Sequence, residues 1–203
     1  SFYRLGGRNT ADVALGNTWG MRRWTTAGGW TVQWNLEGMG YSRFLVSGGI
    51  NEFQTIDFFA NVPVEVRRGA FSARVTPYHE SSHLGDDYFR RTNDKGFRYS
   101  VEGVRAVLSY EPWGGLARVY GGGGRLLHAI PSAGRESLQG GLELTTPDLH
   151  WLEHPCWAYL AQDVQAKAAT SWNPGSSTEL GLRIGFEEVV RAIRVYARYF
   201  SGH

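Results

Sequence analysis

Apolar and polar side chains alternate with a period of two along most of the chain. The clearest runs cover residues 30–36, 56–66, 138–144, 180–186 and 193–199, with Phe59 and Pro63 as the exceptions. Successive side chains of a β-strand point to opposite faces, so this period predicts strands rather than amphipathic helices. About ten such segments occur, each near the roughly 9–11 residues that a tilted membrane-spanning strand needs. The pattern predicts an all-β, antiparallel barrel.

Composition narrows the class of protein further. The 203 residues fit a single domain, 1–203, and 42% hydrophobic with 20% charged residues is too apolar for a disordered chain. A net charge of +2 predicts no nucleic-acid partner. No run approaches the roughly 20 apolar residues of a membrane helix. The single cysteine, Cys156, excludes an intrachain disulfide.

The composition of the two faces favours an apolar outer surface over an apolar core. A soluble ligand-binding barrel or a β-sandwich, the alternatives, would turn the apolar face inward. The polar face here carries large ionisable groups along its length: Glu65, Arg67, Glu143, Glu179, Arg183, Arg194 and Arg198. Aromatic residues cluster near the predicted strand ends, as in the two interfacial girdles of a membrane barrel: Trp19, Trp24, Trp30, Tyr41, Trp113, Trp151, Trp157 and Trp172. We therefore expect a transmembrane, up-and-down barrel of the bacterial outer membrane.

Connection lengths also alternate. Tight turns are predicted at 67–70, 112–115 and 187–191, and longer loops at 43–54, 79–98, 130–135 and 169–177, with 146–155 as an exception. Outer-membrane barrels have short periplasmic turns and long extracellular loops. With a periplasmic N-terminus and an even strand number, one strand is expected ahead of Asp12 and another after His203. The prediction is about twelve strands, with both ends missing from this chain.

Five segments together resemble an uncharacterised bacterial family of envelope proteins, a domain of unknown function. They are Tyr-His-Glu-Ser-Ser-His-Leu-Gly-Asp-Asp-Tyr at 78–88, Leu-Ser-Tyr-Glu at 108–111, Arg-Val-Tyr-Gly-Gly-Gly-Gly at 118–124, Leu-Gln-Gly-Gly-Leu-Glu at 138–143 and Trp-Asn-Pro at 172–174. The similarity runs from about Val13 to the C-terminus. The resemblance implies an envelope barrel and supplies no activity.

The histidine-rich segment is the one cluster that suggests chemistry. On a strand, His79, Ser81 and His83 share one face, which lets an imidazole and a hydroxyl converge as a base and a nucleophile must. The spacing is similar to the His-any-Ser pair of outer-membrane phospholipase and lipid A deacylase barrels. That resemblance implies His79 as base and Ser81 as nucleophile on a lipid-facing wall. A third group must orient the imidazole, and Asp86 is the candidate chosen among nearby polar residues.

Two other interpretations of this segment remain open. In the first, the polar residues organise a long loop, and a bulge at Pro77 reverses which face of the strand the following side chains point to. Alternatively His83 and Asp87 would bind a metal ion. The main expectation is a structural or docking barrel of an envelope complex, with lipid or lipopolysaccharide ester hydrolysis and a narrow channel as alternatives. No cofactor is predicted, a divalent cation being the alternative, and the expected partners are membrane lipids or lipopolysaccharide and an envelope protein complex.

Overall fold

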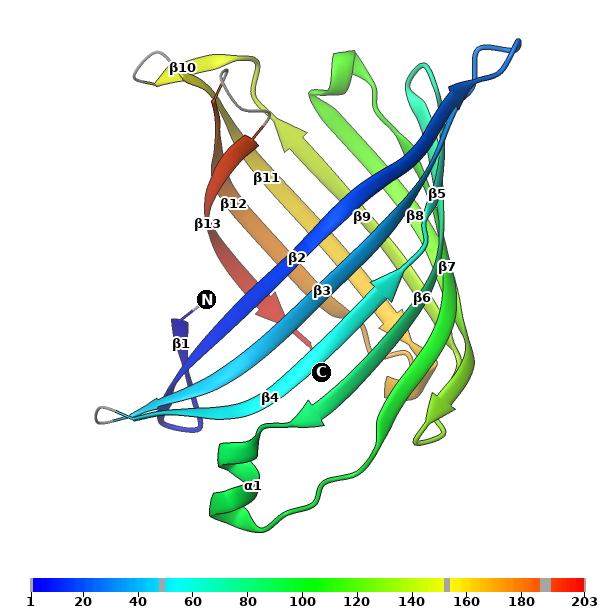
Figure 1. The fold of residues 1–203 in the computed structure, drawn as a ribbon. Helices are drawn as coiled ribbons and strands as arrows, with labels where there is room; N and C mark the ends of the chain where they lie inside the picture. The colour runs from blue at the N-terminus through cyan, green and yellow to red at the C-terminus, as the bar shows by residue number, and fades with distance from the viewer. Residues whose placement is uncertain (1, 48–49, 152–153, 187–190, 203) are drawn as a thin grey trace.

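The computed structural model describes residues 2–47, 50–151, 154–186 and 191–202, and most of them lie in strands (Figure 1). None of the helices in these residues is long and apolar enough to cross a membrane. The strands are β1 (Phe2–Leu5), β2 (Arg8–Thr25), β3 (Thr31–Ser47), β4 (Ile50–Asn61), β5 (Val64–Arg68), β6 (Phe71–Leu84), β7 (Tyr99–Tyr110), β8 (Ala117–Ile130), β9 (Glu136–Thr145), β10 (Leu149–Trp151), β11 (His154–Lys167), β12 (Gly175–Phe186) and β13 (Arg191–Ser201). One α-helix, α1 (Asp86–Thr92), and the 3-10 segments η1 (Trp113–Gly115) and η2 (Ala168–Thr170) complete the described elements.

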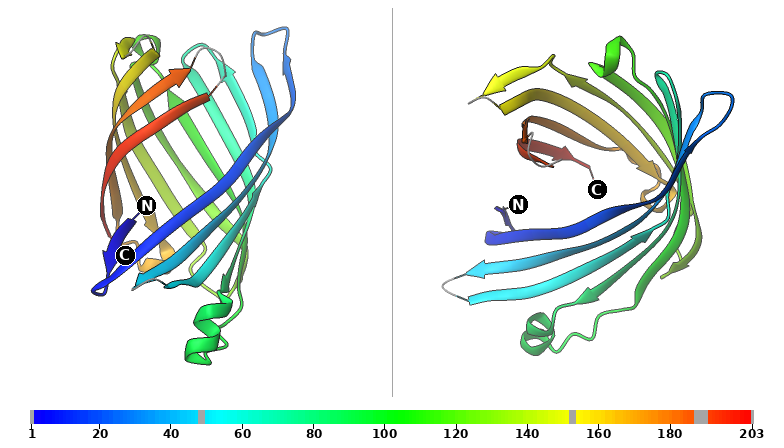
Figure 2. Two further views of the ribbon diagram at one scale, coloured as in Figure 1. Left: turned by 60° about the vertical axis from the view of Figure 1, so that its left-hand side comes forward. Right: turned by 45° about the horizontal axis from the view of Figure 1, so that its top comes forward.

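These strands form one antiparallel sheet in which sequence neighbours pair in order. Eleven lie on one path from β1 to β13, while β5 and β10 are short additions to it. The sheet curls round until its first and last strands face each other (Figure 2). No pairing joins β13 to β1 or β2 among the described residues. The structure is therefore an all-β, up-and-down barrel, as the alternation predicts, with an unpaired edge on either side.

The strand pairing around Pro77 decides which face His79 presents. β6 pairs with β7 without a register shift, and Pro77 lies opposite Val104. The irregularity lies instead in the neighbouring strand, where β4 ends at Asn61 and β5 resumes at Val64. There the buried Pro63 accepts a backbone hydrogen bond from Asn35 at 2.9 Å. The predicted bulge at Pro77 is absent, so the alternation of β6 continues unbroken through His79.

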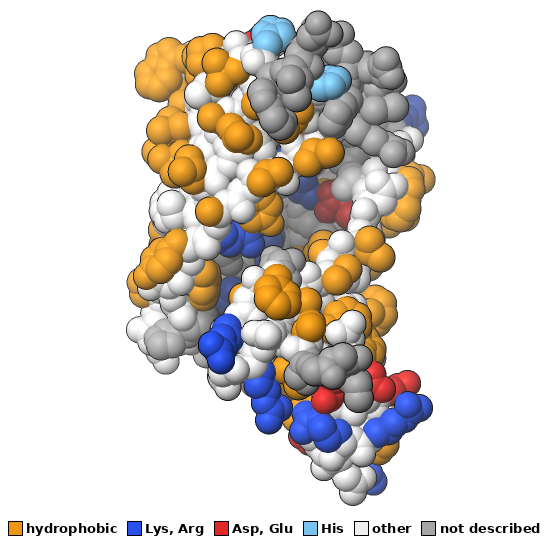
Figure 3. Space-filling view, turned by 90° about the vertical axis from the view of Figure 1, so that its left-hand side faces the viewer, with side chains coloured by type: hydrophobic (Ala, Val, Ile, Leu, Met, Phe, Trp, Pro, Cys, Tyr) orange, Lys and Arg blue, Asp and Glu red, His pale blue; other side chains and the backbone are white. Residues whose placement is uncertain are grey.

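Apolar side chains cover the outer face of the barrel, and polar ones line its lumen. Leu108, Leu180 and Val195 are each more than 60% exposed. Few hydrophobic side chains are buried among the described residues, namely Pro63, Val101, Ala117 and Cys156. Figure 3 shows hydrophobic side chains spread over the outer surface, with charged ones in the central hollow and at the end that carries α1. The inside-out distribution expected from the sequence is present.

Ion pairs bridge neighbouring strands inside the lumen. Arg74 of β6 contacts Glu37 of β3 at 2.6 Å and Glu65 of β5 at 2.9 Å. Arg118 and Glu143 pair at 2.8 Å. Arg198 and Glu179 pair at 2.7 Å, as expected for inward charges on adjacent strands. These contacts link strands across the lumen wall, so the polar face is held together largely by charge-assisted hydrogen bonds.

Three lumen tyrosines lie over glycines on the adjacent strand. The pairs are directly opposite in register: Tyr78 with Gly103, Tyr120 with Gly141, and Tyr159 with Gly181. A Cβ atom built on each of these glycines would fall within 3 Å of the tyrosine ring. Glycine thus supplies space for an aromatic neighbour, a known device for pinning strand register.

Several predicted boundaries differ from the structure. The loop expected at 43–54 is mostly strand, because β3 continues to Ser47 and β4 starts at Ile50. Tyr41, expected in an aromatic girdle, points into the lumen and donates a hydrogen bond to Asp12. Ahead of Asp12, where the sequence predicts a strand missing from this chain, the four residues of β1 pair with β2. The turn predicted at 187–191 falls mainly on 187–190, outside the described residues.

Candidate functional site

The outer face of β6 changes from apolar to polar along the strand. Phe71 and Val75 near its start are exposed hydrophobic residues. Arg74 points into the lumen, which fixes the phase of the strand. By alternation His79, Ser81 and His83 all lie on the outer face. The structure therefore confirms that these three residues share one face of an extended strand.

The side chain that contacts His79 comes from the neighbouring strand. Glu102 of β7 lies directly opposite His79 in register. Its Oε1 atom is 3.0 Å from Nδ1 of His79, and the two side chains are 42% and 44% exposed. An ionised carboxylate can only accept, so Nδ1 donates the hydrogen, and in the neutral imidazole this leaves the lone pair on Nε2. A serine, a histidine and a carboxylate therefore occupy neighbouring positions on the outer wall.

Glu102 was missed by reasoning from the sequence, although a signal was available. Glu102, Val104, Ala106 and Leu108 follow one another at two-residue intervals and so share one face of β7. A carboxylate therefore lies on a face that is otherwise apolar over this stretch. Such a group on an apolar face needs a polar partner. What the sequence lacks is the register between β6 and β7, which places that partner at His79.

Ser81 lies next to the histidine and faces a second serine. Its register partner on β7 is the buried Ser100, and its partner on β4 is Phe58. Among the described residues, no hydrogen bond joins the Ser81 hydroxyl to His79. Both side chains end in freely rotating bonds, and catalytic hydrogen bonds are often longer in a ligand-free enzyme.

The remaining predicted site residues are placed elsewhere. Asp86 begins α1, beyond the end of β6, and the acid in contact with His79 is Glu102 rather than Asp86. Asp87 accepts a hydrogen bond from the Phe53 amide at 3.2 Å. The His83 ring packs edge-on against Phe58, with centroids 6.0 Å apart. No group of three or more His, Cys, Asp or Glu side chains that could hold a metal ion occurs in the described part of the chain, and metal binding by His83 and Asp87 stays a prediction.

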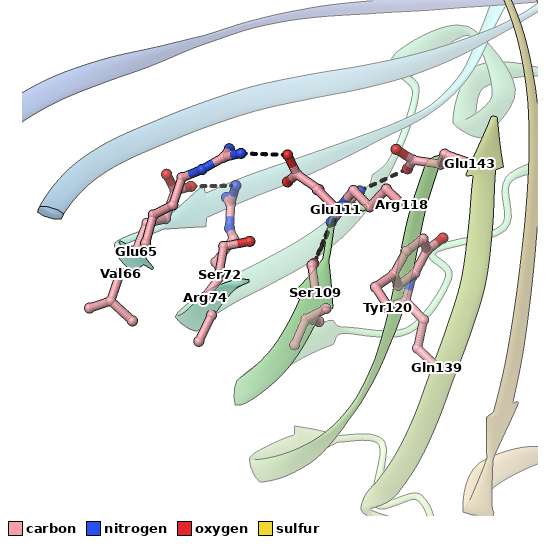
Figure 4. Close-up of a pocket in the computed structure, with 13 residues that line it drawn as sticks. Glu65, Val66, Ser72, Arg74, Ser109, Glu111, Arg118, Tyr120, Gln139 and Glu143 are labelled. Atoms are coloured by element: carbon pink, nitrogen blue, oxygen red, sulfur yellow. Dashed lines mark hydrogen bonds and ion pairs between the residues drawn. The ribbon is translucent and has the colours of Figure 1, made fainter. Parts of the chain in front are cut away.

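The lumen contains a polar cavity of about 430 Å³ (Figure 4). Its charged residues pair among themselves, with Arg67 2.6 Å from Glu111 and Arg118 2.8 Å from Glu143. Arg118 also donates a hydrogen bond to Ser109. Since these charges satisfy one another, the cavity is explained by the stability of the barrel. The outer-wall cluster is the better candidate for chemistry.

Comparison with known proteins places the chain in a family without assigning an activity. A search of curated proteins and of solved structures finds no match. The profile of one family, described as a protein of unknown function, matches residues 3–203. Because this match covers nearly the whole chain, the protein belongs to the DUF1207 family of proteins of unknown function.

Proposed function

We propose that this protein is an outer-membrane barrel that hydrolyses acyl esters of envelope lipids on its outer wall. The observation that carries the proposal is the 3.0 Å contact between His79 Nδ1 and Glu102 Oε1. Ser81, two residues from His79 on the same face, completes a nucleophile, base and orienting acid. Phospholipid or lipopolysaccharide acyl chains are the substrate class, because such lipids would surround this wall.

The distribution of apolar surface supports the membrane setting. A wall of exposed leucine, valine and aromatic side chains around a charged lumen is unfavourable in water. The same arrangement suits a bilayer, where lipid covers the apolar band and adjacent strands of the curled sheet pair their backbone groups everywhere except at its two edges. The long connection from β6 to β7, residues 85–98 with α1, marks the expected extracellular end. Ser81 lies close to the start of this connection at Gly85, within reach of the outer leaflet.

A hydrogen-bonded histidine and carboxylate on a lipid-facing wall also argue for function. Charged side chains on the lipid face of a barrel cost up to about 2–4 kcal/mol at the midplane and less near the interface. His79 and Glu102 occupy outward-facing positions of β6 and β7. Further along β7 the outward-facing positions hold the apolar residues Val104, Ala106 and Leu108. Ionisable groups that face lipid generally mark functional sites.

The proposed reaction follows from the positions of the three groups. Ser81 Oγ attacks the ester carbonyl carbon while His79 Nε2 takes the hydroxyl proton, and Glu102 stabilises the imidazolium that forms. The proton then passes to the departing alkoxide, leaving an acyl group on Ser81. Water, deprotonated by the same nitrogen, releases the fatty acid and restores the serine. Ser100 offers a hydroxyl donor on this face for the oxyanion.

Replacing the outer pair with apolar residues is expected to stabilise the barrel. The double variant His79→Leu, Glu102→Leu removes two polar groups from the lipid-facing wall, so urea unfolding in vesicles should show a gain of about 1–2 kcal/mol. The matched control is Glu179→Leu, Arg198→Leu on the lumen face. It should lower stability, because Tyr159 also donates to Glu179 at 2.6 Å and would lose its partner. A loss of stability in the outer variant would indicate a structural role for the pair.

A direct test combines turnover with covalent labelling. The purified, folded protein would be assayed in detergent on p-nitrophenyl esters and phospholipid, with and without calcium. A fluorophosphonate probe should label Ser81, and both labelling and turnover should vanish in Ser81→Ala. The neighbouring Ser82→Ala, whose side chain faces the lumen by alternation, is the control and should keep both. A folded barrel with neither turnover nor label would overturn the proposal and favour a docking barrel or a channel.

A further inference from the structure

A shallow groove of about 410 Å³ on the outer wall begins at His79. It crosses β4 and β3 and ends against β2. Phe58 flanks it beside Ser81, and Leu15 with Trp19 forms the far side. Phe58 is 46%, Leu15 76% and Trp19 48% exposed, so these walls present free apolar surface. His79 is its one ionisable lining residue.

Small residues form the floor of this groove. Gly38, Gly40 and Ala60 lie on the outer face between the bulky walls. A Cβ atom on Gly40 would meet only the Phe58 ring, at 3.9 Å, and one on Gly38 would meet only Trp19, at 3.6 Å and beyond. Neither glycine is thus needed for close backbone packing. Their effect is to leave the outer surface hollow at this place.

We propose that this groove binds the acyl chain of the ester that Ser81 attacks, and that it selects for chain length. The inference rests on the proposed hydrolase function. The groove is apolar throughout and polar only at the end where the ester carbonyl must sit, which matches a fatty acyl group. Three strand spacings separate β6 from β2, or roughly 14 Å, the reach of about ten carbons at ordinary bond lengths.

Filling the floor of the groove tests this assignment. Gly40→Val adds an isopropyl group between Phe58 and Leu15 without a backbone clash. Hydrolysis of p-nitrophenyl dodecanoate relative to butyrate should fall at least tenfold, since an apolar pocket discriminates by that much for a small change in volume. The butyrate ester, whose short chain does not reach β3, is the internal reference for this ratio.

Gly121→Val is the matched control. Gly121 also lies on the outer face, and its added Cβ would meet only the Gln139 carbonyl oxygen, at 3.9 Å. It borders a different apolar hollow, near Phe71 and Tyr110. This variant should keep the wild-type ratio between the two esters.

The outcomes separate the two proposals. Turnover that depends on Ser81, with an unchanged ester ratio in Gly40→Val, would overturn the groove while leaving the hydrolase intact. An equal fall in the ratio for Gly121→Val would also overturn it, because the effect would then belong to the outer surface in general. Absence of Ser81-dependent turnover in the wild-type protein would overturn the hydrolase, and the groove assignment with it.

Discussion

Replacing His79 with alanine is expected to lower ester turnover by about a thousandfold, the usual contribution of a general base. Without this imidazole, Ser81 loses the histidine that Glu102 orients, and His83, two residues from Ser81 on the other side, packs against Phe58 instead. The loss should appear in kcat rather than KM, because His79 interacts with the reacting hydroxyl and contributes little to binding the acyl chain. Initial rates on p-nitrophenyl esters, measured across substrate concentration, separate the two parameters.

His83→Ala provides the matched control for this result. His83 lies on the same face of the same strand, further towards α1, but its ring packs on Phe58. It should retain most of the wild-type kcat. Equal losses in the two variants would mean that any histidine removed from β6 disturbs the strand, and His79 would lose its assigned role.

Glu102 acts through His79 and is a positioning residue. Glu102→Gln keeps the shape of the side chain but replaces the carboxylate with an amide, which can hold the imidazole in the wrong tautomer. The variant should therefore lose activity even though its side chain has nearly the same shape. Glu102→Asp, which keeps the charge on a shorter stem, should retain more kcat than Glu102→Gln. The reverse order would show that the contact serves packing alone.

The architecture was predictable because it depends on a local pattern. Alternation along 56–66 and 180–186 requires only that successive side chains of a strand point to opposite faces, and the structure has strands in both places. Which face of each strand points into the lumen followed from the charged residues, since Glu179 and Arg198 are more easily paired inside a lumen than on an apolar surface. Neither inference needs knowledge of which strands touch.

The site was predictable only within one strand. His79 and Ser81 lie two residues apart, so their common face follows from the alternation alone. Their acid is 23 residues beyond His79 on β7, and its position depends on the register between the two strands. Register is a tertiary property, set here by the pairing of Pro77 with Val104 and of Tyr78 with Gly103. The nearby sequence offers Asp86 instead, which lies on α1.

Loop boundaries were the least predictable feature. Residues 43–54 contain Ser, Gly and Asn and predict a long loop, yet β3 and β4 pair from Glu37 with Asn61 to Ser47 with Ile50. The register shift between Arg43 and Phe44 shows how the chain absorbs the irregular part of this sequence within the hairpin. Composition indicates where a turn is tolerated, whereas pairing with the adjacent strand decides where it forms.

Gly141→Ala is expected to lower the free energy of unfolding by about 3 kcal/mol, although it adds one methyl group. The new Cβ would collide with the Tyr120 ring and would lie 2.5 Å from the Gln162 carbonyl oxygen, a backbone atom that cannot rotate away. Moving Tyr120 would break its hydrogen bond to Asp163, at 2.6 Å. Asp163 also accepts from Gln139 at 2.8 Å and Gln165 at 2.9 Å, so the disturbance would extend over three strands.

Gly140→Ala, one residue earlier, isolates the cause. Its added Cβ would point to the outer face and meet the Tyr120 carbonyl oxygen at 3.5 Å, an ordinary contact. Both variants remove the same backbone freedom from the unfolded chain, so their difference reports the lumen collision alone. Urea unfolding in vesicles, followed by tryptophan fluorescence, should show a lower midpoint for Gly141→Ala and little change for Gly140→Ala. Equal midpoints would mean that Tyr120 can leave Gly141 at little cost, and the pairing of tyrosine with glycine would then contribute little to the register of this barrel.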